Sequence, residues 1–189
     1  MLKKALKWLG IALGGIAGAL IVWLGVSILL LMCLFSAAGD AQDTPRRDGF
    51  WQQHISIELH VNVQDAAVLS EHDSHGGFLG DGTAMVSLKL KDGSMPGAMA
   101  GNPNWKPLPM PDALAEEIYD ERGWFRDGEG NLFVPEVKNG FYFFLDRHDM
   151  AADIFDPEGL SDPARYSQNY TAAVYDAEEN VLYYLAVDT

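Results

Sequence analysis

The fold is decided most clearly near the C-terminus, by residues 170–187, YTAAVYDAEENVLYYLAV. Two runs rich in Val, Tyr and Ala, residues 170–175 and 181–187, flank the polar segment 176–180. Two β-forming runs separated by a short polar segment are typical of a β-hairpin. The stretch therefore predicts two antiparallel strands at the end of the chain.

Three segments upstream carry further strand patterns. The apolar run 141–145, FYFFL, has no polar face, which is typical of a central strand covered on both sides. Residues 54–63 and 83–91 instead alternate between apolar and polar side chains, which is typical of strands with one buried face. The expected inward residues are Ile55, Ile57, Leu59, Val61 and Val63 in one segment and Ala84, Val86, Leu88 and Leu90 in the other. One-sided strands of this kind belong to an antiparallel sheet.

Residues 111–122 predict a helix. A proline suits its first turn, the acidic residues Asp112, Glu116 and Glu117 suit its positive N-terminal end, and Gly123 follows it. Residues 124–134 predict a hairpin that turns at DGEGN. Together these patterns predict an α+β domain in which about five to seven antiparallel strands pack against one or two helices.

The N-terminal part of the chain predicts a single transmembrane helix. Residues 8–39 contain no charged side chain, and three lysines, Lys3, Lys4 and Lys7, precede them. A helix over residues 8–35 would be about 42 Å long, against a bilayer hydrocarbon core of roughly 30 Å. A cleaved signal peptide is the alternative, because the Ser-Ala-Ala sequence at 36–38 would serve as a cleavage site. The apolar run is about twice too long for one, however.

These observations give three segments and an orientation. Residues 1–36 are the cytoplasmic basic flank and the anchor, residues 37–50 are a linker, and residues 51–189 are an acidic α+β domain. Positive charge is retained on the cytoplasmic side, so the lysine flank predicts a cell-membrane protein with its C-terminal domain outside the cytoplasm. The single cysteine, Cys33, falls within the anchor, so the domain must fold without disulfides.

Small residues recur within the anchor at Gly10, Gly14 and Gly18. Residues four apart share one helix face, and small side chains let two helix backbones approach closely. The functional interpretation is a homodimer or docking to a partner membrane helix. The alternative is that glycine is simply common in transmembrane helices.

Charge limits the partners of the C-terminal domain. The formal net charge is −14, and the three lysines before the anchor contribute +3, so the rest of the chain carries −17. Such a surface repels phosphate backbones, which argues against nucleic acid as a partner. It tolerates cations or a basic partner, although acidity that serves only solubility is the simpler explanation.

The segment 72–82, HDSHGGFLGDG, holds the first group of candidate binding residues, which are His72, Asp73, His75 and Asp81. A divalent metal is one interpretation, because zinc needs three or four ligands and His72, His75 and Asp81 would supply three. No His-Glu-x-x-His motif or phosphate-binding loop supports it. We favour a loop whose side chains bond to their own backbone, and we expect no cofactor.

The second group of candidates, Asp146, Arg147 and His148, follows the aromatic strand. Functional residues concentrate in loops, and an Asp–His pair can orient a general base. No serine of the chain lies in a Gly-x-Ser-x-Gly context, so no nucleophile can be assigned. A solvated cluster of salt bridges is the preferred interpretation.

Four blocks of the sequence, residues 75–82, 104–109, 139–148 and 175–184, resemble those of an uncharacterised family of small membrane-anchored proteins from Gram-positive bacteria. The resemblance implies a single membrane anchor followed by a small outer domain. It implies no activity, because none is known for that family, and no role for any residue.

The sequence thus favours a non-enzymatic, single-pass membrane protein whose outer domain binds a ligand or a protein partner. One alternative is a metal-dependent hydrolase that acts at the cell surface through the segment 72–81. Another is an immunity or inhibitor protein that protects the producing cell at its membrane.

Overall fold

The computed structural model describes residues 23, 24, 26–28, 48–76, 80–91, 93–120, 123–148, 151 and 153–189. The chain divides into two compact units, Met1–Pro45 and Arg46–Thr189, and each is described by itself. In the first unit, Trp23, Leu24 and residues 26–28 are helical. Within the described part of the chain, none of the helices has the length and apolar character needed to span a bilayer. Gly10, Gly14 and Gly18, with most of the predicted anchor, lie outside the described residues.

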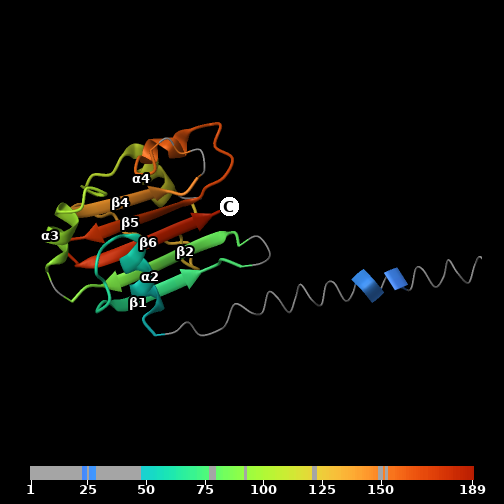
Figure 1. Cartoon of the computed structure of the whole chain (residues 1–189), viewed down its shortest axis with the longest axis horizontal. Helices are drawn as coiled ribbons and strands as arrows, with labels where there is room; N and C mark the ends of the chain where they lie inside the picture. Colours follow the sequence, from blue (N-terminus) through green and yellow to red (C-terminus); the bar gives the residue numbers. More distant parts are fainter. Residues whose placement is uncertain are drawn as a thin grey trace, which may run out of the picture. The chain divides into compact units, whose positions relative to one another are not determined.

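The second unit is built on one antiparallel sheet in the order β1-β2-β6-β5-β4-β3 (Figure 1). Its strands are β1 (Ala67–Asp73), β2 (Gly82–Lys89), β3 (Trp105–Pro107), β4 (Gly140–Asp146), β5 (Tyr170–Asp176) and β6 (Val181–Asp188). The helices are α2 (Phe50–Glu58), α3 (Met95–Ala100), α4 (Asp112–Tyr119) and the 3₁₀ helix η2 (Pro157–Ser161). The predicted α+β class and the number of strands are confirmed. The predicted one or two helices were too few, because α3 is a short Met-Pro-Gly-Ala-Met-Ala segment without a strong helical pattern.

The C-terminal hairpin is confirmed as β5 and β6. Their register pairs Tyr175 with Leu182 and Asp176 with Val181. The Asp176 carboxylate accepts hydrogen bonds from the backbone N–H groups of Glu178 and Glu179, which closes the turn. The strands predicted at 141–145 and 83–91 and the helix predicted at 111–122 are also present, as β4, β2 and α4. The hairpin predicted at 124–134 is reduced to an isolated bridge between Arg126 and Leu132.

The strand predicted at residues 54–63 is wrong, because residues 54–58 belong to α2 and residues 59–63 form a turn and irregular backbone. Trp51, Ile55 and Leu59 lie four residues apart, share one helix face and are buried. Ile57, which the alternating pattern placed inward, is 67% exposed. The apolar residues of the segment fit both a strand with a period of two and a helix with a spacing of four. Burial against the sheet selects the helix. Strand β1 was not predicted, because it is an edge strand that is exposed along most of its length and shows no apolar face.

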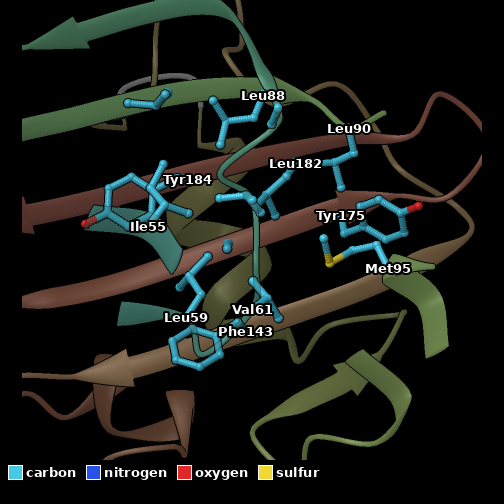
Figure 2. Close-up of a cluster of buried hydrophobic side chains, with 14 of the residues drawn as sticks. Ile55, Leu59, Val61, Leu88, Leu90, Met95, Phe143, Tyr175, Leu182 and Tyr184 are labelled. Carbon is cyan, nitrogen blue, oxygen red and sulfur yellow. The ribbon is translucent and has the colours of Figure 1, made fainter. Parts of the chain in front are cut away.

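Side chains of the sheet alternate between two apolar layers. On one face, α2 and α3 pack against the inward residues of β2, β6 and β5, and Figure 2 shows this cluster, in which Ile55, Leu59 and Met95 meet Leu88, Leu182, Tyr175 and Tyr184. On the other face, α4 and η2 cover Met85, Leu185, Phe144 and Tyr142. We call these the α2 face and the α4 face. The apolar run 141–145 has no polar side because β4 is covered on both.

Candidate functional site

A cavity of about 250 Å³ opens on the α2 face, where β1 and β6 end. We call it the α2 pocket. It is lined by Phe50, Trp51, His54, Glu58, Asp73, His75, Ala84, Arg147, Tyr184, Ala186 and Asp188. Aromatic side chains of α2 form one wall, and ionisable side chains from the strand ends form the other.

A chain of ion pairs runs along the strand-end wall. The two ring nitrogens of His75 face two carboxylates, with Nδ1 2.6 Å from Oδ1 of Asp73 and Nε2 3.0 Å from Oδ2 of Asp188. Arg147 Nη1 donates to Oδ1 of Asp188 at 2.8 Å. The imidazole of His75 therefore bridges the two carboxylates.

The sheet register positions these groups. Asp73 and Asp188 are the last residues of β1 and β6, and both strands pair with β2. Between them, the backbone of Gly82 packs directly on His75, because a Cβ at residue 82 would lie 2.5 Å from the Cα and the backbone nitrogen of His75. Any side chain larger than hydrogen at residue 82 would displace the pocket histidine.

Arg147 spans three strands. It follows β4, and its Nη2 donates to the backbone carbonyls of Tyr170 and Val187 at 3.0 and 3.2 Å, as well as to Asp188. The guanidinium therefore joins the ends of β4, β5 and β6 beneath the pocket. Its Nη2 group and one N–H of Nη1 donate to these partners.

Glu58, at the end of α2, forms the centre of a second network. It accepts hydrogen bonds from the hydroxyls of Tyr184 and Thr171, each at 2.5 Å, and His54 Nε2 lies 3.2 Å from its Oε2. Burial raises the pKa of this carboxyl, but the hydrogen bonds from His54, Thr171 and Tyr184 outweigh burial and lower the pKa to about 2. Burial, and then the Glu58 charge, raise the pKa of Tyr184 well above its ordinary value.

Three aromatic rings surround the imidazole of His54. The ring of Phe50 lies parallel to it, with centroids 5.8 Å apart, and Phe50 is 41% exposed. Trp51 and Tyr184 meet it edge-on at centroid distances of 6.0 and 5.9 Å. The pocket lining therefore combines aromatic rings with carboxylates.

The candidate residues of the segment 72–82 do not all lie at the α2 pocket. Asp73 and His75 enter the pocket, whereas His72 is exposed and pairs with Met85, whose side chain belongs to the α4 face. Asp81 is exposed and does not line the pocket. Among the residues that the structure describes, no three His, Cys, Asp or Glu side chains form a group that could hold a metal ion, and the set His72, His75 and Asp81 is included in that statement. The expected bonding of this segment to its own backbone is present, because Asp73 Oδ1 accepts from the N–H of His75 at 2.8 Å.

The three candidates that follow the aromatic run, Asp146, Arg147 and His148, also lie in different surroundings. Arg147 joins the pocket, but Asp146 forms a two-point ion pair with Arg165, at 2.8 and 2.9 Å. The side chains of that pair are only 1% and 4% exposed, so the interpretation as a solvated cluster is wrong for Asp146. Burial raises the pKa of Asp146, but the hydrogen bonds from Arg165 and from the backbone N–H of His148, together with the positive charge of Arg165, outweigh burial and lower the pKa. His148 is buried and packs beside Tyr166, with ring centroids 4.6 Å apart.

Sequence reasoning missed His54, Glu58, Tyr184 and Asp188 as pocket residues. His54 and Glu58 lie four apart, which places them on one face of a helix. The pattern was read with a period of two, which assigned both to a solvent face. Asp188 carries no local signal, because its role depends on which strand pairs with β6.

A second, wider depression of about 820 Å³ lies along α4. Its lining includes Asp112, Glu116, Glu117, Tyr119, Asp120 and Trp124. It is acidic but contains no histidine or arginine among the residues that the structure describes there, so it lacks the paired network of the α2 pocket.

Compared with protein-family models, curated proteins and solved structures, the chain shows no match.

Proposed function

We propose that this protein is a single-pass membrane protein whose C-terminal domain lies outside the cytoplasm and binds a ligand or protein partner at the α2 pocket. One observation carries the choice of site. Charged side chains from α2, β1, β6 and the segments after β1 and β4 converge on a single cavity and are held there by fixed hydrogen bonds. Side chains that are already positioned before a ligand arrives lose little conformational entropy on binding.

The chemistry of the lining favours binding over hydrolysis. Tyr184 is the hydroxyl-bearing side chain among the described lining residues, and it donates to Glu58. Its raised pKa makes it a poor nucleophile near neutral pH. Both nitrogens of His75 face carboxylates, so neither is directed at a substrate as a general base would be.

The membrane placement rests on the sequence. Residues 8–39 are free of charge over a length that exceeds a bilayer core, and the basic flank precedes them. Protease added to intact protoplasts of expressing cells should digest residues 40–189 and leave a membrane-embedded N-terminal fragment. Complete protection of the domain would contradict the orientation, and its recovery in the medium before protease is added would show that the anchor is cleaved.

The binding proposal is tested by site-specific photocrosslinking in native membranes. A benzophenone amino acid replaces Phe50 at the pocket mouth, and in a matched control it replaces Tyr166, which is 67% exposed and does not line the pocket. We expect a discrete adduct from residue 50, identified by mass spectrometry, that is lost when Asp188→Asn is added. Identical adducts from both positions, or none from residue 50, would refute binding at this pocket.

A further inference from the structure

We infer that the ligand of the α2 pocket presents a cationic nitrogen group, an ammonium or a guanidinium, to Asp188, Asp73 and Glu58. The inference rests on the proposed function, because it names the chemistry that the same pocket recognises. Either a basic side chain of a protein partner or a small free amine would supply this group.

The fixed charges of the pocket favour a cation. Three carboxylates, Glu58, Asp73 and Asp188, line the cavity with one permanent cation, Arg147. The other basic side chains of the lining, His54 and His75, pair with these carboxylates. Arg147 already donates to Asp188 and to two backbone carbonyls, so these donors are not available to an anionic ligand. A carboxylate has about four acceptor sites, and Glu58 and Asp188 each contact three polar atoms of the protein, so a ligand that brings one further donor suits them.

Glu58 keeps its charge over the whole physiological range, because its pKa of about 2 lies far below neutral pH. The chain as a whole carries −14, so its long-range field also attracts cations toward the pocket. An anion would be repelled at long range by the net charge of the chain and inside the pocket by the carboxylates. An uncharged apolar group would remove water from the carboxylates without replacing their hydrogen bonds.

The aromatic wall supports the same class of ligand. Phe50 is 41% exposed, lines the same cavity as the three carboxylates and stacks on the ring of His54. Organic cations are attracted to the faces of aromatic rings, and this attraction increases when water is excluded. Carboxylates and aromatic rings in one cavity form a combination that suits an ammonium or a guanidinium.

The size of the cavity limits the bound group. About 250 Å³ is below the range of roughly 300–1,000 Å³ that drug-sized ligands and cofactors occupy. The pocket therefore accepts one side-chain-sized group and excludes a whole nucleotide. A lysine or arginine side chain meets this limit, and so does a short alkylamine.

The test compares two ligands that differ in charge but hardly in shape. Full-length protein in detergent micelles is titrated with N-acetyl-arginine methylamide and with N-acetyl-citrulline methylamide, whose ureido group is neutral. The NMR signal of the Trp51 indole N–H in the pocket reports binding. We expect the arginine derivative to bind at least about tenfold more tightly, because charge-assisted hydrogen bonds to carboxylates are much stronger than neutral ones. Equal affinities would overturn the inference.

Two variants test whether the preference for arginine over citrulline arises in the α2 pocket. Asp188→Asn should reduce the preference for arginine over citrulline to less than about threefold. The matched control is Glu116→Gln in the acidic depression along α4, which should leave the preference unchanged. Loss of the preference in Glu116→Gln, with Asp188→Asn unaffected, would assign cation binding to α4 and overturn the inference. If Asp188→Asn does not fold, the comparison of arginine with citrulline on the natural chain still decides.

The source of the cation is resolved by two further probes. A blocked Gly-Gly-Arg-Gly-Gly peptide that binds more tightly than agmatine supports a protein partner, and the reverse order supports a small amine. A pocket-dependent photoadduct at residue 50 without any preference for arginine would refute the cation and retain the binding function. Absence of both the adduct and the preference would refute both.

Discussion

Replacing Glu58 with glutamine should change how the stability of the C-terminal domain depends on pH. Glutamine keeps the shape of the side chain but removes the charge that Tyr184, Thr171 and His54 stabilise. In the folded protein the pKa of Glu58 is lowered from 4.5 to about 2. A carboxyl with a lowered folded-state pKa stabilises the protein above its unfolded pKa, and this contribution is lost as the pH falls through the folded pKa.

The magnitude follows from the difference between the two pKa values. A difference of about 2.5 pKa units corresponds to roughly 3 kcal/mol of unfolding free energy at neutral pH. The Glu58 side chain is 17% exposed, and solvent screening lowers our expectation to about 2 kcal/mol. The contribution is fully present above about pH 5.5 and mostly lost by pH 2.5.

Urea unfolding of residues 46–189, measured at pH 7 and pH 2.5, checks this expectation. Glu58→Gln should be less stable than the natural sequence by about 2 kcal/mol at pH 7, and the two should nearly converge at pH 2.5. The matched control is Glu71→Gln, an exposed carboxylate on the edge strand β1, which should change stability by less than about 0.5 kcal/mol at either pH. A constant offset between Glu58→Gln and the natural sequence at both values of pH would refute the proposed role of the Glu58 charge.

Three further changes test other parts of the chain. Asp146→Asn should lower the free energy of unfolding by about 3–5 kcal/mol, because it leaves the buried guanidinium of Arg165 without its partner, and a loss below about 1 kcal/mol in denaturant titrations would show that the pair is dispensable. Gly82→Ala should cost about 1–3 kcal/mol in thermal melts, whereas Gly93→Ala, where a Cβ meets nothing within 4 Å, should be neutral, and equal effects would contradict the close backbone contact. Gly14→Ile should lower self-association of the anchor in a membrane reporter assay, and an unchanged signal would leave that glycine without a packing role.

Local sequence patterns correctly predicted those elements whose own residues carry a clear apolar, turn or capping pattern. The β5–β6 hairpin was predictable because two β-rich runs flank a polar turn, and α4 because acidic residues and a proline mark its start. The apolar run in β4 predicted coverage on both faces, which α2 and α4 provide from opposite sides. In each case the residues of the element itself carry the whole signal.

The sequence failed where two periods fit the same residues. Between residues 50 and 63 the apolar positions suit a strand with a period of two and a helix with a spacing of four. Only packing against the sheet decides between them, because it buries Ile55 and leaves Ile57 exposed. The edge strand β1 was missed for another reason. Its side chains are mostly exposed, so its sequence does not show a buried apolar face.

The charge of the domain, the antiparallel sheet and the Asp73–His75 contact follow from local sequence. The contact does so because residues two apart in one turn meet without help from the rest of the chain. The contact of His75 with Asp188, 113 residues away, and that of Arg147 with the same carboxylate across 41 residues depend instead on how the strands are arranged. Glu58 and Thr171 likewise meet across 113 residues. These contacts follow from the order and register of the strands, which bring distant chain segments to one end of the sheet. Periodicity fixes which way a side chain points, but it does not fix which strand lies beside it.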